Sequence, residues 1–441
     1  MSTLEQLGRV LAGLDVKTMP DALRQKLRLH VADVVGAWVA ATATAEGKAL
    51  LGFRAATARS LGDHVMINCA LARLSEVDDI HLAAMITPGA IVVPAALTIS
   101  ASLPPLEADE LAAAIVAGYE VMIRLGLAID GPTALYRGIW PTYIGAPLGV
   151  AAVAARLFKL DATQTAHALA SALTLSAPGV GHHNAATTTR WFAIGHAARG
   201  GLVAAQGAQM RFTADLDLLD GPFFKNVYGI TPKLSAFTDE LDQPSSVAQL
   251  SFKPWCAARQ TMPAVQALKD IIASGVEPDR MTEIHVAVLP PHLKMIDHGV
   301  VSGDRASFLT SLTYQMAAAA LAPTALDDLS QTKLGLTPPL HAFMDCITLN
   351  ADVGLLADYP AQWTARVTVV TSAGNHERIV SQVPGDPADT FDGATVTSKF
   401  IRFAAPVVGE RDAIVLLGQA LGVLADTRHC ATILQRIGAA A

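Results

Sequence analysis

The apolar pattern of this chain changes near residue 245, and this change constrains the fold more than any other feature. From residue 3 to about 245, alanine- and leucine-rich segments follow one another with helical spacing, and no stretch alternates with a period of two. Ala and Leu favour helices because they lose little side-chain freedom there. The sequence marks three helix starts: Asp21, Glu107, and Asp161 with Gln164 in a capping-box pattern. This region is therefore predicted to be entirely helical.

Beyond Lys253 the pattern becomes mixed. Residues 282–289 alternate and end at two prolines, which predicts a strand, and residues 364–371 and 377–383 predict a hairpin with a loop of four or five residues. Helical spacing returns at 305–322 and again at 412–439. We therefore predict a mainly α fold in two parts. A large all-helical domain would comprise residues 1–245 and 393–441, and a smaller α+β domain residues 246–392.

Bulk composition limits where such a chain works. Half of the residues are apolar (51%), only 16% are charged, and the formal net charge is −7. The longest apolar segment, Leu111–Ile129, contains Glu120 and Arg124, so no membrane-spanning helix is predicted. The N-terminus lacks a secretory-signal pattern and the four cysteines have no CxxC spacing, which predicts reduced thiols in the cytoplasm. The absence of a basic stripe predicts no nucleic-acid partner, and the low charge predicts a buried interface in a homo-oligomer.

The densest polar cluster lies between Ser75 and His81 and contains Glu76, Asp78 and Asp79; Thr87-Pro88-Gly89 follows it. Carboxylates that are buried close together repel one another, which raises a pKa and can make one of them an acid. The competing interpretation is a solvated helix end, since charge runs usually face water.

A second polar segment contains His182 and His183, followed by Arg190 and Trp191. Arg190 could bind a carboxylate through two parallel hydrogen bonds. Adjacent histidines point apart in an extended chain, and no further His or Asp stands at ligand spacing, so we predict no metal site.

Two further candidates follow the change in pattern. Lys253 and Arg259 lie where the helical region gives way to the mixed one, and cations at such a junction could hold an anionic substrate. The alternative is an ordinary linker whose cations extend to solvent. The Tyr314 hydroxyl could donate a proton or complete a buried hydrogen-bond network. Nucleotide-binding glycine loops, the serine-hydrolase elbow and HExxH are missing from the sequence, so nicotinamide, ATP and serine-hydrolase chemistry find no support.

Five sets of residues, in this order and spacing, carry a resemblance to a known family. They are Val77-Asp78-Asp79 with Pro88-Gly89-Ala90 and Val93-Pro94-Ala95; Pro141-Thr142 and Gly149; Thr189-Arg190 with Ile194-Gly195 and Ala197-Ala198-Arg199; Lys253-Pro254 with Arg259, Thr261 and Pro263; and Ser311-Leu312 with Tyr314. Together they resemble the MmgE/PrpD family, which includes 2-methylcitrate dehydratase, cis-aconitate decarboxylase and iminodisuccinate epimerase. The resemblance implies a helical domain built from both chain ends, a smaller α+β lid, a cleft between them, a homodimer and no cofactor.

The chain departs from the family at several polar positions. The family's two His-Pro pairs are Thr87-Pro88 and Trp140-Pro141 here, its Thr-Lys-Pro-x-His-x-Gly segment is residues 189–195, and its Lys-Pro-Tyr-Pro is residues 253–256. Positive charge survives at Arg190 and Lys253, but the histidines do not. Losing one general acid or base typically costs about 10²–10⁴ in rate, so other residues replace them or the reaction has changed. Trp140, Trp191 and Trp255 would also make the pocket less polar and favour a more hydrophobic substrate.

These residues predict a cofactor-independent lyase or isomerase that removes a proton next to a carboxylate or carbonyl of a small substrate and stabilises the resulting anion. The predicted catalytic residues are Asp79 or His182 as base, Tyr314 as acid, and Glu76. The predicted substrate-binding residues are Arg190, Lys253, Thr87, His81, Trp140, His183 and Arg259. Two other functions stay open: a member that binds a small ligand without catalysis, and an enzyme rebuilt for ring opening or cyclisation of an apolar substrate.

Overall fold

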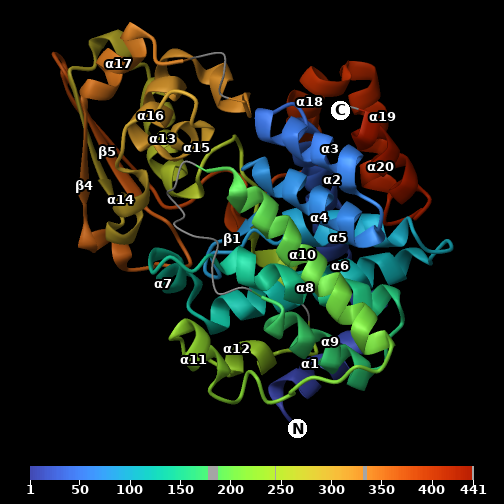
Figure 1. Cartoon of the computed structure of the whole chain (residues 1–441). Coiled ribbons are helices and arrows are strands. Elements are labelled where there is room, and N and C mark those ends of the chain that lie inside the picture. Colours follow the sequence, from blue (N-terminus) through green and yellow to red (C-terminus); the bar gives the residue numbers. More distant parts are fainter. Residues whose placement is uncertain (177–186, 244, 331–334, 440–441) are drawn as a thin grey trace. The chain divides into compact units, whose positions relative to one another are not determined.

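The computed structural model describes residues 1–176, 187–243, 245–330 and 335–439, and the chain divides into two compact units (Figure 1). The first unit consists of Met1–Phe252 with Asp392–Ala441, and the second of Lys253–Phe391. Among the described residues, the regular secondary structure of the first unit is helical apart from one pair of two-residue strands, whereas the second unit contains a four-stranded sheet. The predicted fold class, mainly α with a large helical part and a smaller α+β part, is confirmed.

Both ends of the chain build the first unit. Its helices are α1 (Thr3–Ala12), α2 (Asp21–Ala41), α3 (Ala45–Thr57), α4 (Leu61–Leu74), α5 (Gly89–Ser100), α6 (Ala108–Ala128), α7 (Gly131–Tyr136), α8 (Pro141–Leu157), α9 (Ala162–Thr174), α10 (Thr189–Gln209), α11 (Phe223–Tyr228), α12 (Ser235–Thr238), α18 (Gly393–Val408), α19 (Glu410–Gly422) and α20 (His429–Ala439). The C-terminal helices α18 and α19 pack on α2, near the other end of the sequence (Figure 1).

The helix starts predicted from the sequence are largely confirmed. Glu107 is the N-cap of α6, and the side chain of Asp161 accepts a hydrogen bond from the backbone of Gln164 at the start of α9. The prediction for Asp21 was wrong in detail, because Pro20 is the N-cap and Asp21 is already the first helical residue of α2.

Glycines allow α10 to lie unusually close to its neighbours. A Cβ atom on Gly195 would lie 2.2 Å from the Met66 carbonyl oxygen in α4, and one on Gly201 would lie 2.2 Å from the Pro147 carbonyl oxygen in α8. Only glycine permits this backbone approach. These contacts hold the first half of α10 closely against α4 and α8.

The most apolar long helix, α6, lies inside the first unit. It is long and apolar enough to cross a membrane, but 94% of its most apolar stretch is buried inside the unit. The core helix of a globular protein has the same length and composition. Its two buried charged residues, Glu120 and Arg124, pair with each other, since Arg124 Nε lies 3.1 Å from Glu120 Oε2. Glu120 also accepts hydrogen bonds from the backbone and hydroxyl of Ser246.

One short strand was missed in the helical region. Strand β1 (Ile80–His81) pairs with β2 (Leu250–Ser251) in antiparallel register. Two residues are too few to show an alternating pattern, so the prediction of no strand before residue 245 was wrong here. This pairing places the segment just before Lys253 in the first unit.

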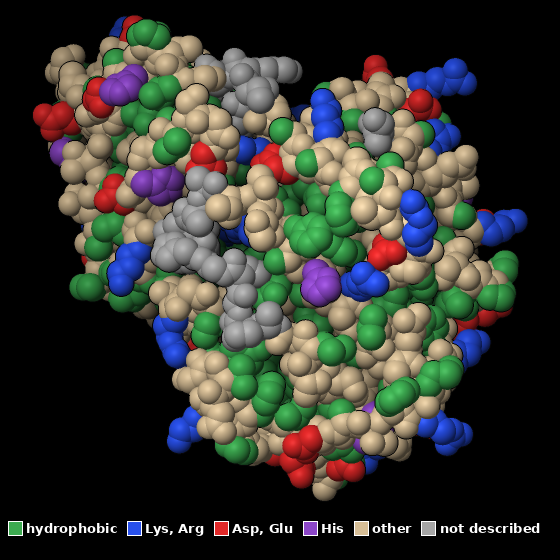
Figure 2. Space-filling model, in the orientation of Figure 1, with side chains coloured by type: hydrophobic (Ala, Val, Ile, Leu, Met, Phe, Trp, Pro, Cys, Tyr) green, Lys and Arg blue, Asp and Glu red, His purple; other side chains and the backbone are tan. Residues whose placement is uncertain are grey.

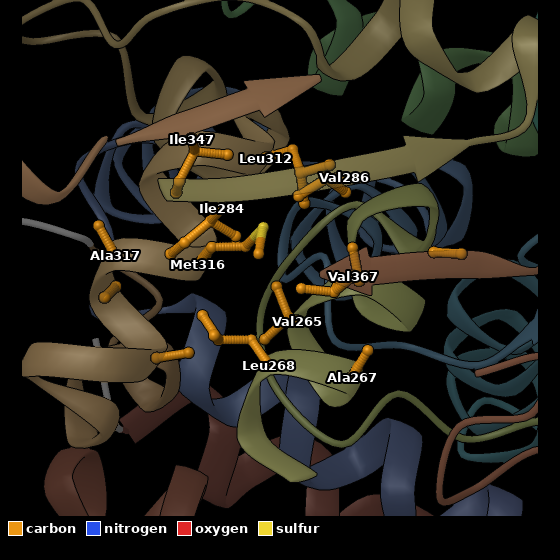
Figure 3. Packing of buried hydrophobic residues seen from close by; sticks show 14 of the residues in the cluster. Val265, Ala267, Leu268, Ile284, Val286, Leu312, Met316, Ala317, Ile347 and Val367 are labelled. Atoms are coloured by element: carbon orange, nitrogen blue, oxygen red, sulfur yellow. The ribbon is translucent and has the colours of Figure 1, made fainter. Parts of the chain in front are cut away.

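The second unit is a sheet covered by helices. Its strands are β3 (Glu283–Val288), β4 (Ile347–Ala351), β5 (Ala365–Thr371) and β6 (Gly374–Val380), in the order β4-β3-β5-β6, with β3 and β4 parallel and the other pairs antiparallel. Its helices are α13 (Met262–Ala273), α14 (Pro290–Ile296), α15 (Arg305–Thr310), α16 (Leu312–Leu321) and α17 (Pro338–Asp345). Figure 3 shows its core, in which Val265 and Leu268 of α13 lie near Ile284 of β3 and Met316 of α16.

The mixed pattern predicted β3 and the β5–β6 hairpin correctly but misjudged two details. Thr371 pairs with Gly374, so the hairpin loop has two residues rather than four or five. The predicted helix 305–322 is interrupted at Ser311, whose hydroxyl caps α16. Strand β4, in which Ile347 is the one buried residue, gave no periodic signal.

Candidate functional site

Asp79 lies at the centre of a buried polar network in the first unit. We call His30, Asp33, Asp79, Tyr119 and Lys399 the Asp79 network; each is at most 3% exposed. Asp79 Oδ1 accepts a hydrogen bond from the Gly89 backbone N–H at 2.8 Å, and Oδ2 accepts one from the Tyr119 hydroxyl at 2.9 Å. His30 Nδ1 lies 3.3 Å from the same Oδ2. The carboxylate is thus fixed from several sides.

The start of α5 is shaped to receive this carboxylate. Gly89 is the first residue of α5, and a Cβ there would lie 2.5 Å from Asp79 Oδ2. A helix N-terminus offers an unpaired N–H group and a favourable dipole for negative charge. Gly89 therefore leaves space for the Asp79 carboxylate and donates a hydrogen bond to it.

A second carboxylate in the network is paired with a cation from the C-terminal part of the chain. Lys399 Nζ, in α18, lies 2.7 Å from Asp33 Oδ1 in α2 and donates to the Val77 carbonyl oxygen at 3.0 Å. This lysine links α2, α18 and the loop that carries Asp79. Burial raises the pKa of Asp33, and the Lys399 charge opposes this shift.

The protonation states of the other members follow from burial. Burial lowers the pKa of His30, with Asp79 acting in the opposite direction, and the ring stacks on Phe252 with a centroid distance of 3.9 Å. Burial, followed by the Asp79 charge, raises the pKa of Tyr119 well above its ordinary value. At neutral pH Tyr119 is therefore a hydrogen-bond donor to Asp79, and His30 is neutral.

A second polar group adjoins the first through Asp78. We call Arg73, Glu76, Asp78, Trp140, Arg190 and Trp191 the Arg–Trp cluster. Arg73 Nη1 lies 3.2 Å from both Glu76 Oε2 and Asp78 Oδ1. Burial lowers the pKa of Arg73, but the Asp78 and Glu76 charges raise it by more, so the net direction is upward and the guanidinium stays charged.

Two arginines share the same pair of indoles. The guanidinium carbon of Arg190 lies 5.1 Å from the Trp140 ring centroid and 4.6 Å from that of Trp191; the distances for Arg73 are 5.4 and 5.8 Å. Arg73 is 5% exposed, whereas Arg190 is only partly buried. A guanidinium stacked on a ring uses its face, so its planar N–H edge is the part suited to a carboxylate.

His81 and Thr87 lie in the same unit. The Ala84 backbone N–H donates to His81 Nδ1 at 3.1 Å, and burial lowers the His81 pKa to about 4. His81 is therefore neutral at pH 7 with its proton on Nε2. The Thr87 backbone N–H donates to Thr142 Oγ1 at 3.1 Å, which joins the segment before α5 to the first turn of α8.

The remaining described candidates lie in the second unit. Arg259 is buried, its Nη2 lies 2.6 Å from Asp386 Oδ2, and its guanidinium carbon lies 5.6 Å from the Trp363 ring centroid. Burial raises the pKa of Tyr314 to about 12, with a contribution from Asp328. Lys253 is 2% exposed at the start of this unit.

The structure thus brings part of the predicted site together. Glu76, Trp140 and Arg190 meet around Arg73, and Asp79 follows directly after this cluster. His182 and His183 lie outside the described residues. Among the residues that the structure describes, no group of three or more His, Cys, Asp or Glu could hold a metal ion.

Sequence reasoning missed five residues of these two groups: His30, Asp33, Arg73, Tyr119 and Lys399. His30, Asp33 and Tyr119 are polar residues within otherwise apolar helical segments, which is a usable signal for a buried network. Lys399 gave no local signal, since its partner Asp33 is 366 residues away.

The fold and these groups define a two-part, mainly helical protein whose helical unit is completed by its C-terminal helices and buries paired carboxylates and cations. Two family models match it: the MmgE/PrpD N-terminal domain over residues 5–229 and the MmgE/PrpD C-terminal domain over residues 255–421. The chain therefore belongs to the MmgE/PrpD family, as the sequence resemblance implied. No protein with a curated description matches the sequence. The second match extends beyond Phe391 into α18 and α19, which belong to the first structural unit.

Proposed function

We propose that the protein is a cofactor-independent lyase or isomerase acting on a small carboxylate or carbonyl substrate. Members of the MmgE/PrpD family are typically lyases or dehydratases. The observation that carries the proposal is the stacking of Arg190 on Trp140 and Trp191, because it presents a partly exposed cation on a rigid aromatic support. In this proposal Arg190 binds a substrate carboxylate and Lys253 adds a second positive charge.

The chemistry proposed is proton removal next to the bound carboxylate or carbonyl. Such a step creates a carbanion or enolate, which fixed cations in a weakly polar site stabilise strongly. The indoles of Trp140 and Trp191 exclude water from the cations and so strengthen this interaction. His81, Thr87, His183 and Arg259 are proposed to contribute to binding.

The proposed base is Asp79 or His182, and the proposed acid is Tyr314. The Tyr314 hydroxyl is protonated at neutral pH, as a general acid must be, although burial raises its pKa to about 12 and makes it a weaker acid. Asp79 already accepts hydrogen bonds from Gly89 and Tyr119, so as a base it would exchange one of these for the substrate proton. Glu76 is proposed to hold Arg73, and through it the indoles, in place.

The first test is a thermal-stabilisation screen of small carboxylic acids, including hydroxy-di- and tricarboxylates. We expect at least one acid to raise the melting temperature of the wild type and to lose this effect in Arg190→Ala. Acids that stabilise are then incubated in D₂O and followed by ¹H NMR. Exchange of the proton next to the carboxylate, or appearance of an alkene, supports the proposal. Equal stabilisation of wild type and Arg190→Ala would contradict it.

One observation favours a second function, binding without catalysis. Thr87, Trp140 and Ala193 stand where the family has histidines, so three proton carriers are lost. In that case an acid stabilises the protein, but its protons do not exchange in D₂O. The reduced polarity around Trp140 and Trp191 also supports a rebuilt reaction on a more apolar acid, for which aromatic and alkyl acids in the same screen are the probes.

The cytoplasm is the proposed location. Cys69, Cys256 and Cys430 are buried thiols with no disulfide. Nucleic acid and membranes are not among the partners proposed.

A further inference from the structure

A cavity of about 330 Å³ lies in the first unit, where α2 meets the link between α19 and α20. Its apolar lining comes from both ends of the chain and from α6, and consists mainly of Val16, Met19, Leu27, Ala112, Leu421 and Leu424. The volume lies within the range of small-molecule sites. It is about eleven times the roughly 30 Å³ that one water molecule occupies in the liquid, which gives room for a ligand of about ten non-hydrogen atoms.

Arg28 supplies an oriented positive charge to this cavity. Its Nε donates a hydrogen bond at 2.6 Å to the carbonyl oxygen of Leu421, in the last turn of α19, and this bond fixes the plane of the guanidinium. Among the described residues, no carboxylate forms an ion pair with Arg28 and no acceptor bonds to its Nη1 or Nη2. The edge formed by these two nitrogens is suited to a carboxylate, which it binds through two parallel hydrogen bonds.

The other charged residues of the cavity make its two ends different. Arg24 is already compensated, because its Nη1 lies 3.2 Å from Asp109 Oδ1 and its Nη2 donates to the Val16 carbonyl oxygen. Asp21 begins α2 seven residues before Arg28, and therefore lies about 10 Å away along the helix axis. One end of the cavity is thus positive and the other negative.

An exposed arginine alone does not indicate a site. Figure 2 shows Lys and Arg side chains scattered mostly singly over the surface that it draws, which is ordinary for exposed cations. A neighbouring cavity of about 620 Å³ also contains an arginine, Arg9, but Asp15 and Asp242 line it as well. Two carboxylates beside one cation make that larger cavity unfavourable for an anion, whereas the charges around Arg28 favour one.

We propose that the cavity beside Arg28 binds a small monocarboxylic acid with an alkyl or aryl body. The carboxylate binds the Nη edge of Arg28, and the body lies on Leu27, Leu421 and Leu424, whose apolar surface it removes from water. A second carboxylate at the far end of the body meets Asp21, so a dicarboxylic acid is disfavoured. None of the described residues that line this cavity belongs to the Asp79 network or to the Arg–Trp cluster, so the site is separate from the one proposed around Arg190.

The position of the site suggests what the bound acid does. It contacts α2, α6 and the α19–α20 link together, and α19 packs on α2 (Figure 1). His30 and Asp33 of the Asp79 network follow Arg28 on α2. A bound acid therefore ties the C-terminal helices to the helix that carries part of the network, and should stabilise the first unit.

Calorimetric titration and thermal unfolding of the full chain test the ligand chemistry with octanoate, octanamide and octanedioate. We expect octanoate to bind saturably and to raise the melting temperature. Octanamide keeps the alkyl body without the charge, and octanedioate adds a carboxylate near Asp21, so each should bind at least about tenfold more weakly. No saturable binding of octanoate, or equal binding of all three compounds, would overturn the proposal.

Variants test the location. Arg28→Gln keeps an N–H group for the Leu421 carbonyl but removes the charge, and Ala425→Phe places a large side chain in the cavity from an exposed position. Each should weaken octanoate binding by at least about tenfold. Arg9→Gln, in the neighbouring cavity, is the matched control and should bind octanoate as the wild type does. Circular dichroism confirms that each variant is folded.

Arg190→Ala separates this site from the proposed active site. It should keep its octanoate binding, and alkyl acids are therefore tested at Arg190 in the Arg28→Gln background. Unchanged binding in Arg28→Gln, or a loss of binding in Arg9→Gln or Arg190→Ala instead, would place octanoate elsewhere and disprove the site beside Arg28.

Discussion

The Asp79 network and the Arg–Trp cluster lie side by side in the helical unit, yet their charged side chains differ in exposure and in their partners. In the network every member is at most 3% exposed, and its carboxylates are held by side chains from α2, α6 and α18. In the cluster Arg73 is buried between carboxylates, but Arg190 lies partly exposed on two indoles. Burying a charge is costly unless an opposite charge and hydrogen bonds compensate for the lost water. The network therefore fixes the loop that carries Asp79, whereas in our proposal Arg190 of the cluster binds the carboxylate of a ligand.

The largest expected effect comes from breaking the buried ion pair of the network. Lys399→Met leaves the Asp33 carboxylate without its cation in the interior and should lower the free energy of unfolding by about 3–5 kcal/mol. Urea unfolding followed by circular dichroism measures this.

Lys159→Met provides the control for that experiment. Lys159 makes an equally short ion pair with Glu110, 2.7 Å, but is 68% exposed, so its loss should cost about 1 kcal/mol or less. If both variants lost a comparable amount of unfolding free energy, burial would not determine how much an ion pair stabilises the protein. The double variant Asp33→Leu with Lys399→Met should recover part of the stability.

Acid should destabilise the protein through its buried neutral histidines. The His81 pKa is about 4 in the folded state and 6.5 as a free side chain, so below pH 6.5 the unfolded chain binds a proton that the folded state does not. Stability is complete above pH 6.5 and falls as pH drops toward 4, by about 1.4 kcal/mol per pH unit for one proton.

Unfolding free energies measured in steps from neutral to acid pH test this expectation. His81→Asn keeps an acceptor for the Ala84 N–H but cannot be protonated, so its stability should decline less steeply, leaving it about 2 kcal/mol less affected by about pH 4.5. His285→Asn, at an exposed position, should follow the wild type. An unchanged slope in His81→Asn would mean that His81 is protonated in the folded state.

A methyl group at the start of α5 should disturb the Asp79 network more mildly. In Gly89→Ala the new Cβ overlaps the Asp79 carboxylate, and relieving this overlap should cost about 1–3 kcal/mol. Gly393→Ala is the matched control, because Gly393 also begins a helix but has no atom within 4 Å of its added Cβ. Its unfolding free energy should not fall. Equal losses would indicate that glycine matters at both sites for the backbone alone.

The local sequence pattern predicted most of the fold because most helices and strands show their periodic or capping pattern over several residues. Asp161 with Gln164 marked α9, and alternation marked β3. The elements that the sequence did not predict are short or mostly exposed strands. Strand β1 has two residues, and Ile347 is the one buried residue of β4, so neither strand shows an alternating pattern.

The candidate site was predictable only where its residues are close in sequence. Glu76, Asp78 and Asp79 formed a visible polar run, but nothing local distinguishes a solvated run from one that is buried against Arg73 and Tyr119. Burial is decided by distant helices. Lys399 shows this most clearly, since its role depends on a partner at the other end of the chain.

The smallest effect on stability is expected at Arg190, where the two regions differ most. Arg190→Ala removes a partly exposed cation from Trp140 and Trp191, and an exposed cation–π contact is worth about 0.5–1 kcal/mol. The free energy of unfolding should therefore change by no more than about 1 kcal/mol. Stabilisation by a carboxylic acid should nevertheless disappear.

Arg190→Lys separates charge from geometry at this position. Lysine keeps the positive charge but lacks the planar N–H edge that binds both carboxylate oxygens, so the thermal shift produced by the acid should be reduced rather than lost. Full retention in Arg190→Lys would mean that charge alone attracts the ligand. A loss of stability in Arg190→Ala as large as in Lys399→Met would mean that Arg190, like the Asp79 network, holds the fold, and the contrast between the two regions would no longer hold.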